Sequence, residues 1–169
     1  MKSKRLLWIA LSIIVTLVIV VVITAMLTPQ QTPAFAAAIA FVEAAGRGDD
    51  AAAFALLDER LRAYVASTCP DGSVSACITA YTPPEWGDFL RVVFRRAAPE
   101  FTPEGTIWNV DLIATYAEGT GFSGVCIYTR MAEAGDDDWR VTRWAGFVSC
   151  GDPASRNMAA NPEAPNSAP

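Results

Sequence analysis

Residues 105–116, GTIWNVDLIATY, carry the clearest two-residue period in the chain. Large apolar side chains occur at Trp108, Val110 and Leu112, and polar residues alternate with them. This alternation predicts a β-strand with one buried face. It places Asp111 on the face opposite the apolar side chains.

Two further strands are expected after this one, over residues 122–132 and 139–149. Gly119 and Gly121 interrupt the pattern before the first of them, and the turn sequence Gly135-Asp136-Asp137 separates the two. Connections this short join antiparallel neighbours. The second half of the chain therefore predicts an antiparallel meander.

Two helices are expected at the beginning of the domain. The first spans residues 33–46, because Thr32 can cap it and Pro33 suits its first position. The second begins after the capping residue Asp49 and continues to Tyr64, with apolar residues on one stripe and charged residues on the other. The short turn between them predicts an antiparallel helical hairpin.

A third amphipathic helix is expected after Pro83-Pro84, ending at Pro99. Its inward-facing residues are Trp86, Phe89, Leu90, Val93 and Phe94. The fold class predicted from these patterns is α+β, with an N-terminal transmembrane helix followed by three helices packed on a curved antiparallel sheet.

A helical hairpin, a third helix and an antiparallel meander, in this order over about residues 33–150, resemble the NTF2-like (cystatin-like α+β) superfamily. The two helices at residues 33–64 resemble the opening of its small extracytoplasmic domains. The residues that carry the resemblance are Phe35, Phe41-Val42, Gly48-Asp49, Ala52-Ala53 and Leu56-Leu57. It implies a sheet curled into a cone with a pocket at its open end. Some members of the superfamily are enzymes that use an Asp–His or Asp–Tyr set, and many others are binding or accessory domains.

The absence of histidine from all 169 residues restricts the chemistry. Histidine-based acid–base catalysis, Ser-His-Asp and Cys-His nucleophiles and histidine-ligated metals are all excluded. The Asp-rich turn at residues 136–138 lacks the spaced carboxylates of a calcium loop, so turn formation explains it better. We therefore expect no metal and no cofactor.

Residues 6–27 contain no charge and are rich in Leu, Ile and Val. At 1.5 Å per residue, a helix of this length extends roughly 33 Å, enough to cross a hydrocarbon core of about 30 Å. The nearby basic residues, Lys2, Lys4 and Arg5, all precede the segment, so residues 1–5 are expected in the cytoplasm. A cleaved signal peptide is the alternative, but its apolar region is usually shorter.

This topology makes residues 28–32 a linker, residues 33–152 an extracytoplasmic domain and residues 153–169 a proline-containing disordered tail. After the apolar segment there are ten arginines, no lysine and 18 acidic residues, a net charge of −8. Nucleic acid is therefore a poor partner. The expected location is the cell membrane, with a single pass through residues 6–27.

All four cysteines lie in the part expected outside the cytoplasm, which predicts two disulfides. Cys69–Cys77 would close a small loop. Hairpin geometry places Cys126 opposite about Gly146, so a Cys126–Cys150 bond needs a bulge or a chain that folds back. Otherwise Cys126 or Cys150 pairs with one of the loop cysteines.

Asp111, Tyr128 and Arg143 are the candidate ligand-binding residues, provided that their face of the sheet lines a cavity. The alternative is that Asp111 faces solvent. The function that we expect is a non-catalytic, membrane-anchored binding or interaction module, whose partner is another envelope protein or a small apolar ligand. The alternative is a small enzyme that uses Asp/Tyr acid–base chemistry.

Overall fold

The computed structural model describes residues 11–22, 32–80, 82–118, 124–135 and 137–147. The chain divides into two compact units, Met1–Gln31 and Thr32–Pro169. Residues 11–22 are helical, and the rest of the predicted 6–27 segment lies outside the described residues. Among the described residues, no helix has the length and apolarity needed to span a membrane.

The second unit begins with a helical layer. The first helix, α2 (Pro33–Gly46), has the predicted bounds, and the Oγ1 atom of Thr32 accepts a hydrogen bond from the Phe35 amide at 3.2 Å. The predicted second helix is instead two helices, α3 (Asp50–Ala55) and α4 (Glu59–Thr68). The remaining helical segments are η1 (Pro70–Gly72), α5 (Val74–Thr79) and η2 (Pro84–Trp86).

The split between α3 and α4 arises because Leu57 pairs with the sheet. Leu57 forms an isolated parallel bridge with Val141, and the Asp58 amide donates to the Val141 carbonyl at 3.0 Å. The Asp58 carboxylate then caps α4 by accepting from the Leu61 amide at 2.7 Å. The apolar residues predicted to lie on one long helix are therefore divided between two short helices and the bridge to β4.

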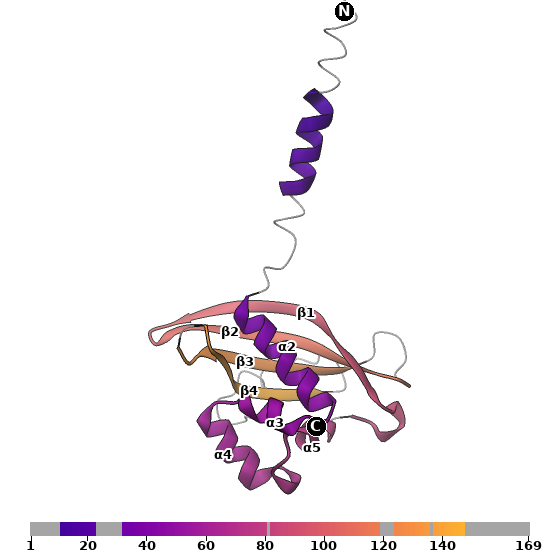
Figure 1. Cartoon of the computed structure of the whole chain (residues 1–169), viewed down its shortest axis with the longest axis vertical. Helices are drawn as coiled ribbons and strands as arrows, with labels where there is room; N and C mark the ends of the chain where they lie inside the picture. Colours follow the sequence, from indigo (N-terminus) through magenta and orange to yellow (C-terminus); the bar gives the residue numbers. More distant parts are fainter. Residues whose placement is uncertain (1–10, 23–31, 81, 119–123, 136, 148–169) are drawn as a thin grey trace, which may run out of the picture. The chain divides into compact units, whose positions relative to one another are not determined.

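Among the described residues, the sheet has four antiparallel strands in the order β1-β2-β3-β4. Their bounds are Phe89–Thr102, Gly105–Tyr116, Val125–Glu133 and Trp139–Phe147. The last three strands confirm the predicted meander. Figure 1 shows α2 lying across one face of the sheet, with α3, α4 and α5 gathered beside the β4 edge.

The prediction of a third helix after Pro83-Pro84 was wrong, because most of that segment is β1. Strand β1 pairs with β2 with register shifts at Leu90 and Arg95, where β1 has an extra residue. Each extra residue interrupts the two-residue alternation, so apolar residues recur at three- and four-residue spacings that resemble a helix. The helical conformation before the strand is limited to η2.

The hydrophobic core lies between the helical layer and one face of the sheet. Phe41 of α2 and Trp144 of β4 are buried, with ring centroids 5.5 Å apart. Val110 and Leu112 are fully buried on the same face, as the alternation predicts. The sheet is not strongly curled, so the cone implied by the resemblance is not observed.

The disulfide Cys69–Cys77 is confirmed, with 5.4 Å between the Cα atoms. Cys126 is also disulfide-bonded and lies opposite Phe147, while Cys150 is outside the described residues. Strand β4 has a bulge at Thr142, where the β3–β4 register shifts between Arg130 and Met131.

Candidate functional site

The sheet face opposite α2, called here the polar face, gathers charged side chains from all four strands. Strand pairing arranges its residues in cross-strand rows. The first row is Arg96, Asp111, Tyr128 and Ala145; the second is Ala98, Asn109, Arg130 and Arg143; and the third begins with Glu100 on β1. Adjacent rows are two residues apart along each strand, about 6.6 Å.

In the first row, the Asp111 carboxylate is neutralised by an arginine. The Nε atom of Arg96 donates a hydrogen bond to Oδ2 of Asp111. The Asp111 side chain is 8% exposed, whereas that of Arg96 is 54% exposed. Tyr128 lies directly opposite Asp111 on β3 and is buried. The carboxylate that the sequence indicated as a ligand or base is thus buried and paired with a half-exposed arginine.

Two arginines face each other in the second row. Arg130 and Arg143 are direct cross-strand partners, and their side chains are half-buried. Like charges directly opposite in a sheet repel each other. Glu100 reduces this repulsion, because its Oε1 atom accepts from Nη2 of Arg130 at 2.8 Å. The other carboxylate oxygen, Oε2, accepts from Nδ2 of Asn109 at 3.0 Å.

These contacts lower the pKa of Glu100. The hydrogen bond from Asn109 is the largest cause, and the charges of Arg130 and Arg143 add to it against the opposing effect of burial. Glu100 is therefore held as a carboxylate, fixed between an amide and a guanidinium group.

A third arginine approaches Arg143 from α4. Nη2 of Arg60 donates to the Thr142 carbonyl at 3.3 Å. Burial lowers the pKa of Arg143, and the charges of Arg130 and Arg60 lower it further, with Glu100 opposing them. The charges of Arg60 and Arg130 therefore both act on Arg143, from α4 and from the neighbouring strand.

The structure brings the three predicted site residues to one face but does not bring all three together. Asp111 and Tyr128 are direct neighbours, whereas Arg143 lies in the next row opposite Arg130. Asp111 does not face solvent as the alternative prediction had it, because the whole residue is only 6% exposed.

Sequence reasoning missed Arg96, Glu100, Asn109 and Arg130 as parts of this site. Asn109 and Arg130 could have been found, because each is two residues from a predicted site residue on the same strand. Arg96 and Glu100 could not, because the β1 segment was predicted to be helical as far as Pro99.

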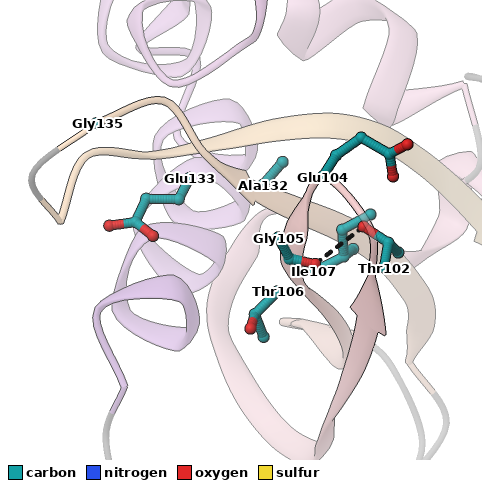
Figure 2. Close-up of a pocket in the computed structure, with 8 residues that line it drawn as sticks. All are labelled: Thr102, Glu104, Gly105, Thr106, Ile107, Ala132, Glu133 and Gly135. Atoms are coloured by element: carbon teal, nitrogen blue, oxygen red, sulfur yellow. Dashed lines mark hydrogen bonds between the residues drawn. The ribbon is translucent and has the colours of Figure 1, made fainter.

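A groove at the tips of the two hairpins has a volume of about 480 Å³. Figure 2 shows its lining, in which the carboxylates of Glu104 and Glu133 point away from each other. The described residues contain no group of three or more side chains placed to hold a metal ion. This groove therefore offers no convergent set of functional groups.

Two smaller pockets also lie away from the predicted site. One, of about 350 Å³, is bordered by Asp58 and Arg140; the other, of about 260 Å³, by Phe89 and Tyr116. Burial raises the pKa of Tyr116, and a hydrogen bond from Thr82 at 2.9 Å partly offsets this. Neither these pockets nor the hairpin groove is lined by Asp111, Tyr128 or Arg143.

Comparisons of the chain with protein-family models, with curated proteins and with solved structures give no match.

Proposed function

We propose that the chain is a membrane-anchored, extracytoplasmic binding module without catalytic activity, and that the polar face of its sheet is the recognition surface. The observation that carries the proposal is the pairing of the acids on this face. Arg96 binds Asp111, and Arg130 binds Glu100. An array of fixed, oppositely charged groups is suited to electrostatic recognition of a partner.

The anchor in this proposal is the uncharged segment 6–27, with its three preceding basic residues inside the cell. Cys69 and Cys77 form a disulfide, and Cys126 is also disulfide-bonded. Disulfides are consistent with an oxidising compartment. The resemblance of residues 33–64 to NTF2-like domains adds support, because many members of that superfamily are binding or accessory domains.

Removal of residues 1–31 tests the anchor. The cut falls at the boundary between the two compact units. We expect the full chain to sediment with membranes and the shortened chain to be a soluble, folded, disulfide-containing protein. A shortened chain that stays insoluble, or one that binds a metal ion in stoichiometric amount, would contradict the proposal.

An Asp/Tyr enzyme is the second candidate, because Asp111 lies directly opposite the buried Tyr128. Proton transfer by Asp111 would require release of its carboxylate from Arg96. Asp111→Asn and Tyr128→Phe distinguish the two functions. In a binding module, neither substitution abolishes partner binding, because the ion pair between Arg130 and Glu100 remains on the polar face. If either abolishes the activity of the protein while its unfolding midpoint is unchanged, the catalytic candidate is favoured.

A further inference from the structure

The groove at the hairpin tips is continuous with the polar face of the sheet. Ile107 and Ala132 are cross-strand partners in the row of that face that begins with Glu100, and both also line the groove. Catalysis and metal binding need convergent functional groups, which the groove lacks. Docking of an extended protein segment does not need them, so the groove can be the hollowed end of the recognition surface.

The middle of the groove is apolar. Ile107 and Ala132 lie side by side on neighbouring strands, and both are half-buried. Apolar surface that remains in contact with water favours contact with a further apolar group. The volume of about 480 Å³ lies in the range of ordinary binding sites. We therefore expect an aliphatic side chain of a partner to cover Ile107 and Ala132.

Two carboxylates stand at the rim of the groove. Within the described part of the chain, its charged lining residues are Glu104 and Glu133, which are both exposed and form no ion pair there. The acids of the polar face, Asp111 and Glu100, each have an arginine partner. Figure 2 shows the two rim carboxylates pointing away from each other, so each can accept from a different cation.

The backbone holds both rim residues in place before any partner binds. Glu104 lies in the tight turn between Thr102 and Gly105, which are cross-strand partners, and Oγ1 of Thr102 donates to the Gly105 carbonyl at 2.9 Å. Glu133 is paired with Trp139 across the β3–β4 hairpin. Groups that are already positioned lose less conformational freedom when a partner binds.

We propose that the groove binds a basic segment of an extracytoplasmic protein. An aliphatic side chain of that segment covers Ile107 and Ala132, and lysine or arginine side chains on either side pair with Glu104 and Glu133. The net charge of −8 on the residues after the apolar segment adds long-range attraction for such a partner. This inference rests on the proposed binding function and names the class of its partner. Its test uses a peptide and no membrane assay, so its failure rejects the partner class without rejecting the anchored binding module.

The experiment is a titration of the full chain, in nonionic detergent, with the peptide acetyl-Lys-Leu-Lys-amide. Binding is followed by the NMR signals of the Gly105 and Gly135 amides, because both residues line the groove. We expect saturable shifts with this peptide and none with acetyl-Glu-Leu-Glu-amide. The proposal is overturned if the lysine peptide shifts neither signal. It is also overturned if spermidine shifts both at a lower concentration, because a simple polycation would then be the ligand.

A second copy of this chain is the competing occupant of the groove. Analytical ultracentrifugation of the full chain, with and without the lysine peptide, distinguishes the two. We expect the mass of the protein to be the same in both conditions. A dimer that dissociates when the peptide is added would assign the groove to a second copy and overturn the proposal.

Glu104→Gln and Glu133→Gln test the rim of the groove. Each is expected to weaken binding of the lysine peptide about threefold, because it removes one exposed ion pair. Glu85→Gln is the matched control, since Glu85 is an exposed glutamate on η2, before β1 begins, whereas the groove lies where β1 ends. Its affinity should equal that of the wild type. Unchanged binding in both rim variants, or equal weakening in the control, overturns the proposal.

The apolar part of the groove is tested by comparing two peptides on the same protein. Acetyl-Lys-Gly-Lys-amide should bind the wild type about fivefold more weakly than the leucine peptide, because it covers no apolar surface. In Ile107→Ser the two affinities should become nearly equal. Their ratio on one variant does not depend on its folded fraction, so partial unfolding cannot produce this result. Equal affinities in the wild type, or an unchanged ratio in Ile107→Ser, overturn the proposal.

Discussion

The ion pair between Arg96 and Asp111 predicts unequal costs for removing its two members. Arg96→Ala leaves a carboxylate that is only 8% exposed without its counter-charge. Breaking a fully buried pair costs about 3–5 kcal/mol, and the half-exposed arginine places this pair at the lower end, about 2–3 kcal/mol. Asp111→Asn leaves an arginine that is 54% exposed and that water can solvate. Its expected cost is about 1 kcal/mol, close to that of a surface pair.

The double variant adds a sharper test. With both charges gone, no buried carboxylate remains, so the double variant should be more stable than Arg96→Ala alone. The coupling energy between the two sites is expected to be about 1–2 kcal/mol. Arg91→Ala, which removes an exposed arginine from the same strand and face, should change stability by less than about 0.5 kcal/mol.

These differences in unfolding free energy are measured by urea unfolding of the protein without residues 1–31, monitored by circular dichroism. They are expected as shifts of the urea midpoint, with the dependence of the free energy on urea concentration unchanged. The reasoning is refuted if Asp111→Asn costs as much as Arg96→Ala. It is also refuted if the two losses of unfolding free energy are additive in the double variant. Additive losses would mean that Arg96 does not stabilise the Asp111 carboxylate.

Replacing both cysteines of the Cys69–Cys77 disulfide by serine opens a loop with a sequence separation of 8 and should cost about 2.5 kcal/mol in the same urea assay. Gly46→Ala places a Cβ atom 2.7 Å from the Phe89 ring, so we expect a loss of about 1–3 kcal/mol, and a neutral effect would show that the ring moves freely. Burial raises the pKa of Asp50, but hydrogen bonds, chiefly from the Ser75 backbone, bring it below its ordinary value of 3.8. A carboxyl group whose pKa is lowered by folding stabilises the folded state at pH values above its pKa in the unfolded chain. The difference in unfolding free energy between wild type and Asp50→Asn should therefore close as the pH falls below about 3.8. A difference that is constant with pH would contradict this.

The strands β2, β3 and β4 could be predicted because their alternation is regular and their turns are short. Strand β1 could not, because its two extra residues, Leu90 and Arg95, break the alternation that identifies a strand. Similarly, nothing in the local pattern separates α3 from α4. The break at Leu57 depends on its bridge to Val141, which is 84 residues away in the chain.

The candidate site was predictable only in part for a related reason. Alternation along β2 and β3 places Asp111 and Tyr128 on one face, but the position of Arg143 depends on the bulge at Thr142. Without the bulge, the register near the hairpin turn would put Thr142 opposite Arg130 and turn Arg143 toward the core. The extra residue brings Arg143 to the polar face and Trp144 into the core.

Photo-crosslinking from the polar face tests the central claim most directly. The photoreactive residue p-benzoylphenylalanine replaces Ala98, an exposed alanine in the second row of the polar face, or Ala63, an exposed alanine on α4. In intact cells that express the full chain, position 98 is predicted to give a discrete adduct of higher mass and position 63 to give none. No adduct from position 98, or the same adduct from both positions, would contradict recognition through the polar face.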